Sequence, residues 1–385
     1  MFINFWYPIC TAEDLRADRP YQATVLGSPF VAFRDSKGEP HVLANTCAHR
    51  GGSLGNGWVK DDCIICPYHG WQYGGDGKCR LVPSFDDGTK IPARAKVDSY
   101  PVQERYGIVH AFLGDLPEEE RPPLFEIEEF DQDGWRATEI MILNLDAYFE
   151  RSMENGLDAA HNEFVHPLQG GPKMRAADMT QEELDWGTRF IAPFGEKEYP
   201  DTKLKQLRGN PEDIHASSWT HGPNVLITWI QFSKVNALHQ YFFEQPIDEY
   251  HTRIFFINLR NCMLEPEHDD RIRNINLNIT HEDIAILEAL RPVGTPETNT
   301  KEILTPSDAP IVRFREWMKD FENRGWRVDL KTMAGNAHDV AYAIPCPDRR
   351  RSGNWVLDPV PMMPSDKRPE NTRTHNTGIH QASNQ

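Results

Sequence analysis

The chain has 385 residues, 39% hydrophobic and 26% charged, which is the composition of a soluble globular protein large enough for two domains. Its formal net charge of −17 argues against a nucleic acid or an anionic membrane as partner, because both require a basic surface. The sequence contains no window of about 20 apolar residues, so we expect no membrane span.

Residues 1–115 read as short strands separated by turns, which predicts a small all-β domain. Turn-forming residues at 27–29 and 35–38 separate the first strands. The apolar start, residues 1–10, lacks the basic residues and the length of a secretory signal, so we expect it to form the first strand. The expected strands are 2–9, 22–26, 30–34, 41–45 and 106–113.

Two loops of this region carry cysteine and histidine in matched pairs. Cys47-x-His49 is followed, after sixteen residues, by Cys66-x-x-His69. Two thiolates and two imidazoles can hold a zinc ion, or a two-iron, two-sulfur cluster with the cysteines on one iron and the histidines on the other. Zinc loops usually carry Cys-x-x-Cys or a His pair, so this spacing favours the cluster. A zinc site and two unrelated Cys/His loops are the alternatives.

The two loops resemble the Rieske cluster motif at every liganding position, with Tyr68 and Trp71 placed to shield the cluster from water. The other five cysteines are scattered and do not form a disulfide framework, which indicates a reducing, cytoplasmic compartment. Cys63 could instead pair with Cys66 as a redox dithiol. Cys79 is better explained as a buried core residue near the cluster than as a ligand.

Residues 116–135 are acidic and proline-rich, which predicts a link between domains. We place the first domain at 1–115 and a second at 136–363. Residues 364–385 are polar, and we expect them to be disordered.

The second domain opens with a polar constellation, Asn155, Asp158, His161 and His166, spaced three, three and five residues apart. Residues three apart are helical neighbours, so Asp158 and His161 should share a face, with the helix ending or loosening near Asn162. Two neutral imidazoles and one carboxylate make the facial triad of non-haem Fe(II). Asp158 is placed to accept the second N–H of His161. The alternative is a polar helix face with solvated histidines.

A Rieske motif followed by Asn-x-x-Asp-x-x-His-x-x-x-x-His resembles the catalytic subunit of the Rieske non-haem iron oxygenases, and the chain length and opening residues 4–8 are most similar to its single-subunit hydroxylases and demethylases. The resemblance implies an α+β fold: a small all-β Rieske domain and a larger START-like (helix-grip) sheet-and-helix domain. It also implies a [2Fe-2S] cluster on Cys47, His49, Cys66 and His69, Fe(II) on His161, His166 and a late carboxylate, and catalytic roles for Asp158 and Asn155. Electrons would pass through His69 or His49, Asp158 and His161 between neighbouring subunits of a homotrimer.

In this family the third iron ligand lies on a late helix ahead of an apolar stripe, and Asp283 fits that description. Asp269, Asp270 and Asp339 are the alternatives. Thr280 could cap the helix and place Asp283 at its third position, where a carboxylate favours the helix dipole.

Segments 225–232, 238–244 and 251–258 alternate as strands and predict an antiparallel sheet around a cavity. Residues 306–326 predict an amphipathic helix. Seven aromatic side chains could line an apolar pocket, although each is more often plain core: Phe164, Trp229, Phe232, Tyr241, Phe243, Phe255 and Phe256.

No Gly-x-Gly-x-x-Gly unit is present, so electrons should come from a separate ferredoxin or NAD(P)H-dependent reductase. The sequence thus predicts a terminal oxygenase that uses dioxygen to hydroxylate, demethylate or dihydroxylate a small apolar, aromatic or polycyclic substrate. The alternative is a non-enzymatic redox or lipid carrier that keeps the Rieske domain. Such a carrier would have no need of the histidine pair.

Overall fold

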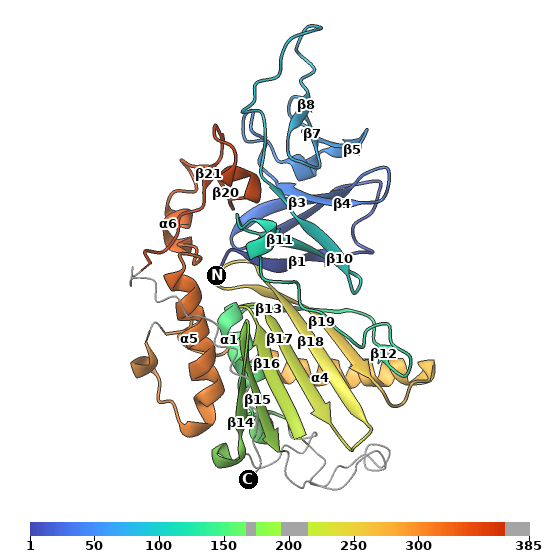
Figure 1. Ribbon diagram of the computed structural model, residues 1–385, viewed down its shortest axis with the longest axis vertical. Coiled ribbons are helices and arrows are strands. Elements are labelled where there is room, and N and C mark those ends of the chain that lie inside the picture. Colours follow the sequence, from blue (N-terminus) through green and yellow to red (C-terminus); the bar gives the residue numbers. More distant parts are fainter. Residues whose placement is uncertain (167–174, 194–214, 297, 366–385) are drawn as a thin grey trace, which may run out of the picture.

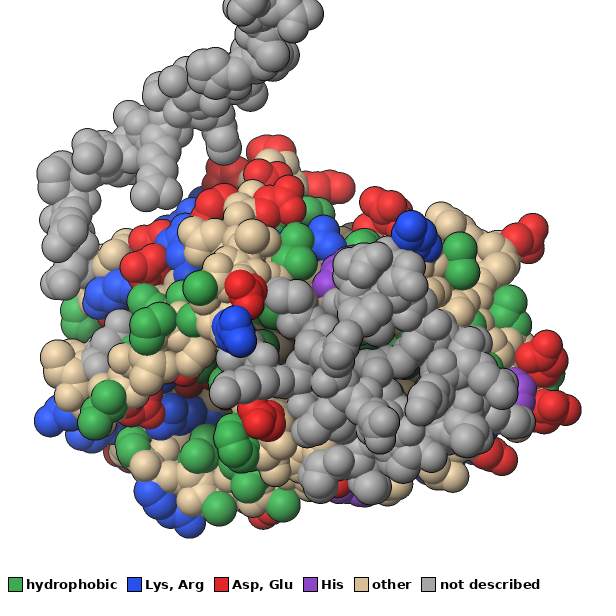
Figure 2. Space-filling view, turned by 90° about the horizontal axis from the view of Figure 1, so that it is seen from below, with side chains coloured by type: hydrophobic (Ala, Val, Ile, Leu, Met, Phe, Trp, Pro, Cys, Tyr) green, Lys and Arg blue, Asp and Glu red, His purple; other side chains and the backbone are tan. Residues whose placement is uncertain are grey.

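The computed structural model describes residues 1–166, 175–193, 215–296 and 298–365 (Figure 1). The predicted disordered tail, 364–385, lies almost wholly outside the described residues. No helix in the described ranges combines the length and the apolar character that a bilayer span requires. On the lower face, acidic side chains are scattered over the described surface with a few lysines and arginines between them (Figure 2).

The first part of the chain forms three small antiparallel sheets at the upper end of the molecule (Figure 1). The strands predicted at 2–9, 22–26, 30–34, 41–45 and 106–113 are confirmed, with shifts of a few residues at their ends. The sheets are β1 (Phe5–Thr11) with β11 (Ile108–Leu113) and β10 (Val102–Arg105); β2 (Tyr21–Val25), β3 (Ser28–Arg34), β4 (Pro40–Ala44) and β9 (Ser99–Tyr100); and β5 (Trp58–Lys60), β6 (Cys63–Ile65), β7 (Gln72–Gly74) and β8 (Cys79–Leu81).

The second part is an eight-stranded antiparallel sheet that the long helix α4 (Asp269–Leu287) crosses on one face (Figure 1). Together with the small β domain, this arrangement confirms the predicted α+β class. The sheet runs in the order β12 (Arg136–Ala137), β19 (Thr252–Arg260), β18 (Ala237–Pro246), β17 (Val225–Gln231), β16 (His215–His221), β15 (Gly187–Pro193) and β14 (Thr180–Leu184), with β13 (Met141–Leu145) also pairing with β19.

Alternation along each strand gives the sheet two different faces. On β17, Val225 and Ile227 point into a core that also contains Tyr106 and Phe243, under the segment 116–135. Leu226 and Thr228 point to the opposite face, which lines a cavity beneath α1 (Phe149–Leu157) and α4. The sheet therefore places one face against the upper domain and the link, and the other against the helices.

The C-terminal part returns to the N-terminus after helix α5 (Ala309–Asn323), which confirms the helix predicted at 306–326. Phe5 packs edge-on against Phe321, with ring centroids 4.8 Å apart, and against Trp326 at 5.6 Å. Asp98 is fully buried and forms an ion pair with Arg349 at 2.6 Å. The described part of the chain continues through α6 (Leu330–Gly335) to the paired strands β20 (Tyr342–Ala343) and β21 (Asp358–Pro359), which lie beside the upper sheets (Figure 1). The domain limits 1–115, 116–135 and 136–363 stay predictions.

Candidate functional site

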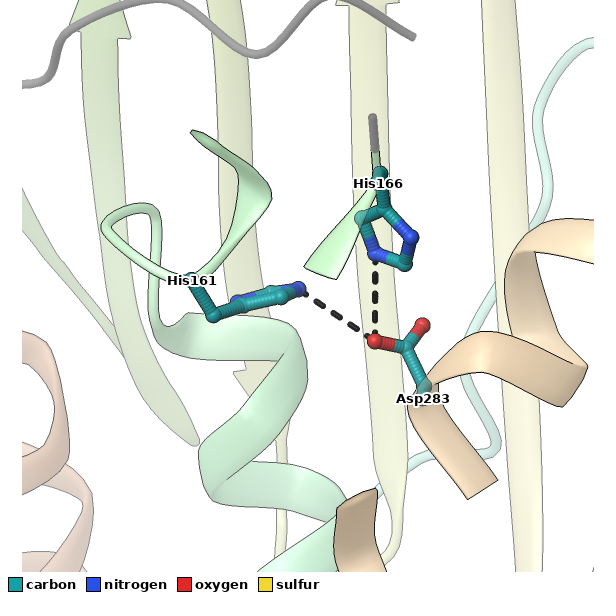
Figure 3. Close-up of side chains that lie close together, drawn as sticks. All are labelled: His161, His166 and Asp283. Carbon is teal, nitrogen blue, oxygen red and sulfur yellow. Dashed lines mark ion pairs between the residues drawn. The ribbon is translucent and has the colours of Figure 1, made fainter. Parts of the chain in front are cut away.

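His161, His166 and Asp283 point toward one another between α1 and α4 (Figure 3). One carboxylate oxygen, Asp283 Oδ1, lies 3.1 Å from Nε2 of His166 and 3.4 Å from Nε2 of His161. These are the two histidines and the late carboxylate that the sequence predicts as a ligand set. They form the one group of three or more possible metal-binding side chains among the described residues.

A break in the helix positions the two histidines. Helix α1 ends at Leu157 and Asp158 adopts an extended conformation, with φ −83° and ψ 108°. A short helix, α2 (Asn162–Val165), follows, and His166 comes directly after it. The prediction that Asp158 and His161 share a face of one helix is therefore wrong, because the helix ends before Asp158 rather than near Asn162.

Each histidine donates its Nδ1–H to a fixed acceptor. For His161 the acceptor is the backbone carbonyl oxygen of Asp158, at 2.6 Å, while the Asp158 carboxylate is 3.8 Å away and accepts from the Ala160 amide. The predicted role of the Asp158 carboxylate as this acceptor is therefore wrong. For His166 the acceptor is Oε2 of Glu282, at 2.8 Å. Because a neutral imidazole carries only one N–H, the Nε2 lone pair of each histidine remains free to bind a metal.

The electrostatics of the triad suit a cation. Burial opposes ionisation of Asp283, but the proximity of His161 and His166 outweighs it and lowers the pKa of Asp283 to about 2. Asp283 Oδ1 is buried without a hydrogen-bond partner among the described residues. Two ligands at right angles on a metal with bonds of about 2.1 Å lie about 3 Å apart, close to the observed separations. The donor set fits a mononuclear metal such as Fe(II).

Asp283 lies in the last turns of α4, so the predicted helix is present but begins earlier than expected. Thr280 is not its cap: the helix starts at Asp269, and the Thr280 hydroxyl donates to the carbonyl oxygen of Asn276 inside the helix. Of the other candidate carboxylates, Asp269 is held by Arg136 and Arg260, and Asp270 and Asp339 are exposed. Glu282 was missed, because only the folded helix shows that it faces His166.

The two Cys/His loops at the upper end of the molecule have the same backbone geometry. The Gly51 amide donates to the Cys47 carbonyl and the Gly70 amide to the Cys66 carbonyl, both at 2.9 Å. Both glycines adopt positive φ, +72° and +70°, a conformation that other residues rarely adopt. A Cβ on Gly52 would lie 3.0 Å from Cys66 Sγ.

The cysteines and histidines of these loops face opposite environments. Cys47 and Cys66 are 2% and 1% exposed, whereas His49 and His69 are exposed, with ring centroids 4.4 Å apart. The Cys47 sulfur is 3.2 Å from the Tyr73 hydroxyl, and Trp71 stacks on His49 at 4.5 Å, whereas Tyr68 is 59% exposed. The shielding role of Tyr68 and Trp71 stays a prediction. A buried sulfur end and an outward imidazole end fit a [2Fe-2S] cluster with unlike irons. All seven cysteines are free.

A cavity of about 160 Å³ extends from the triad between the sheet and the helices. Asn155 and Asp158, the predicted catalytic pair, contribute to its lining with Leu226 and Phe242. None of the seven aromatic residues predicted for the pocket is part of this lining. Phe164 is 80% exposed. Tyr241, Phe243 and Phe255 point into the core on the opposite face of the sheet, because a shift of one residue along a strand reverses the face, and Phe256 packs in the core beside the cavity.

Two protein-family models match the chain. Residues 5–101 match the Rieske [2Fe-2S] domain, and residues 145–324 match the Vanillate O-demethylase oxygenase C-terminal domain. Methylxanthine N1-demethylase NdmA of Pseudomonas putida is 27% identical over 83% of this chain and 89% of its own length. Chlorophyllide a oxygenase of Chlamydomonas reinhardtii is 35% identical over 82% of this chain, which spans only 47% of that protein.

The fold is also similar to solved structures. Pseudomonas putida NdmA with caffeine superposes with a TM-score of 0.68 at 24% identity, covering 83% of this chain and 91% of that one. Dicamba monooxygenase bound to dicamba gives a TM-score of 0.68 at 21% identity, covering 83% and 96%. At these identities the superpositions establish a common fold.

Proposed function

Since the chain belongs to the Rieske non-haem iron oxygenases, we propose that it is the terminal oxygenase for a small apolar substrate, which it hydroxylates, demethylates or dihydroxylates. It is an oxidoreductase, and its cofactors are a [2Fe-2S] cluster and a mononuclear Fe(II). The names of its relatives, a methylxanthine N1-demethylase and a dicamba monooxygenase, support demethylation or hydroxylation of a compact ring compound.

The observation that carries the proposal is the convergence of His161, His166 and Asp283 on the wall of an apolar cavity. Two neutral imidazoles and one carboxylate leave further coordination positions open, which is what oxygen and a substrate need. A carrier would have no use for this set. The non-enzymatic alternative is therefore not favoured.

Each residue has a role in this proposal. Cys47, His49, Cys66 and His69 hold the cluster, and His161, His166 and Asp283 hold the iron. When bound, the cluster would supply electrons one at a time, and the iron would activate dioxygen. The Asp158 carbonyl and the Glu282 carboxylate keep both Nε2 lone pairs directed at the metal. Apolar side chains of the cavity, such as Leu226 and Phe242, keep bulk water from the reacting atoms.

We further propose that the protein works as a homotrimer and receives electrons from a ferredoxin or an NAD(P)H-dependent reductase. The cluster loops flank β6 among the strands at the upper end of the molecule, whereas α4, which carries Asp283, crosses the large sheet in the lower part (Figure 1), so an electron would more readily cross from a neighbouring subunit. Asp158, half-buried beside His161, would lie on that route. The free cysteines suit a reducing cytoplasm.

Metal analysis tests the assignment without knowledge of the substrate. After anaerobic reconstitution we expect about three irons per chain, two in the cluster and one in the triad. His161→Ala should lower this to about two and leave the cluster spectrum intact. An iron content of about two in the unaltered protein would favour the carrier, and a cluster spectrum lost in His161→Ala would remove the two-site assignment.

Turnover tests the reaction itself. A panel of apolar ring compounds, with and without N- or O-methyl groups, is incubated with the protein, a surrogate reductase and labelled dioxygen. We expect a product whose mass carries label from dioxygen, or a demethylated product. Reductant consumption without any modified compound across such a panel would contradict the proposal.

A further inference from the structure

Glu244 lies near the end of β18 on the face that lines the cavity, and it is fully buried. Neither of its carboxyl oxygens makes a hydrogen bond of normal geometry among the described residues, although the Ser152 side chain is close enough to influence the group. Burial raises the pKa of Glu244 to about 8, and the neighbouring Ser152 only partly opposes this. At neutral pH the side chain is therefore mainly a carboxylic acid with a free O–H donor.

An unpartnered polar group in a buried wall costs about 1–3 kcal/mol, so its presence calls for an explanation. The cavity contains a second one. Asn276, on α4 two turns before Asp283, is 3% exposed and accepts from Gln240 at 3.2 Å through Oδ1, but its Nδ2 has no partner in the described structure. Both groups line the same cavity, and each has an unused donor.

The charges of the cavity point to one class of ligand. Its described lining contains no lysine or arginine, whereas Asp158, Glu244 and Asp283 all contribute to it. With Glu244 protonated and Asp283 engaged by the iron of the proposed function, a substrate carboxylate would still be buried near the Asp158 carboxylate, and the described lining offers it no lysine or arginine, which is unfavourable. Apolar side chains make up much of the remainder: Leu143, Leu226, Phe242, Ile254 and Ile284.

Resting on the oxygenase function proposed above, we infer that the substrate is neutral and apolar and carries a carbonyl or similar hydrogen-bond acceptor, and that Glu244 determines specificity by donating its O–H to that acceptor. The Nδ2 group of Asn276 offers a second donor to the same molecule. A site that hydrogen-bonds its ligand through buried groups discriminates strongly against analogues without the matching atom, because the protein groups are then left unpaired.

Three probes that share one ring system test the inference: indane, 1-indanone and indane-1-carboxylate. Binding is measured by equilibrium dialysis against the anaerobic holoprotein. We expect the ketone to bind at least about 10-fold more tightly than the hydrocarbon, and the carboxylate to bind most weakly. Tightest binding of the carboxylate would overturn the inference.

Variants of Glu244 assign the preference to this side chain. Glu244→Gln keeps an N–H donor and should keep the ketone preference within about 3-fold, whereas Glu244→Leu should lose most of the preference and keep only the part that Asn276 supports. Glu249→Leu, at an exposed carboxylate on the loop that follows β18, is the matched control and should behave like the unaltered protein. A ketone preference of undiminished size in Glu244→Leu would overturn the inference.

Infrared spectroscopy tests the protonation state directly. At about pH 6 we expect a protonated-carboxyl band that is absent from Glu244→Gln and shifts to lower frequency when 1-indanone is added. Absence of that band from the unaltered protein would overturn the inference. These measurements involve no turnover: an active oxygenase that prefers the carboxylate would refute this inference alone, and an inactive protein that prefers the ketone would refute the proposed function alone.

Discussion

The two candidate metal sites are built in opposite ways. The ligands of the cluster lie within one short stretch, and each loop is closed by its own backbone hydrogen bonds, from Gly51 to Cys47 and from Gly70 to Cys66. The iron site joins segments that are far apart in the sequence: His166 and its acceptor Glu282 are 116 residues apart. The first site depends mainly on local turns, and the second depends on how α1 and α4 pack.

This difference predicts that the two sites can be lost separately, and the largest effect should come from the carboxylate of the triad. Asp283→Ala removes the one ligand that α4 supplies. We expect turnover to be abolished and the triad iron to be lost, because two imidazoles alone bind Fe(II) weakly. The cluster spectrum should not change. Iron analysis and visible absorption measure both, with exposed Asp270→Ala as the control on the same helix.

Asp158→Asn tests whether the two sites are connected through this residue. It removes a charge and leaves the backbone carbonyl that accepts from His161. We expect both metals to be retained and coupled turnover to fall about 100-fold or more. Single-turnover reduction of the iron by a pre-reduced cluster measures the step. Unchanged transfer in this variant would remove Asp158 from the route.

The sequence predicted the locally built cluster site more completely than the iron site. The cluster ligands and the strands around them could be read directly, because short spacings and turn residues specify them locally. The sequence also identified His161, His166 and Asp283 as candidates, but not their surroundings. The acceptor for His161 proved to be a carbonyl, and Glu282 was not recognised, since both depend on where the chain leaves the helix and on tertiary packing.

The sequence did not identify the side chains that line the pocket, and the reason is related. Most of the seven aromatic residues named as possible lining are core, which was the favoured interpretation for each. Phe242 and Phe243 are adjacent aromatic residues in β18, but only Phe242 lines the cavity, whereas Phe243 packs in the core under the link. Residue type does not determine the face of a strand when both faces are buried. The alternation becomes informative only once the register of the sheet is known.

A change far from the metal should damage the iron site more than the cluster. Arg315 on α5 binds Glu154 of α1 at 2.6 and 3.0 Å, and Glu154 is nearly buried. Arg315→Ala leaves that carboxylate without its main cation, so we expect a loss of about 3 kcal/mol in the free energy of unfolding. Urea titration measures the loss. Iron affinity should fall while the cluster spectrum is retained.

The control for this change lies on the same helix. Arg313 pairs with Glu183 and Glu316, both of which are well exposed, so Arg313→Ala should cost less than about 1 kcal/mol. Equal losses in the two variants would contradict the view that α5 fixes α1 through the buried pair.

A smaller effect is expected from the acceptor of His166. Glu282→Ala leaves Nδ1 of His166 without its carboxylate partner, and we expect iron affinity to fall about 10- to 100-fold. Glu282→Gln retains an acceptor oxygen and should recover most of the affinity. Titration of the apo-protein with Fe(II) under anaerobic conditions measures both. If Gln and Ala were equally impaired, the charge rather than the hydrogen bond would be the important property.

The smallest effect is expected from a change in the backbone turn of a cluster loop, which should leave the iron site unaffected. Gly51 has φ +72°, and a Cβ there would meet no atom within 4 Å, so Gly51→Ala tests backbone conformation alone. We expect a cost of about 1–2 kcal/mol, seen as earlier loss of cluster absorbance in urea, with the iron of the triad unaffected. Gly52→Ala adds a Cβ 3.0 Å from Cys66 Sγ and should disturb the cluster by contact instead. If Gly51→Ala released the triad iron as readily as the cluster, the two sites would not be independent, and the division between locally and distantly built centres would fail.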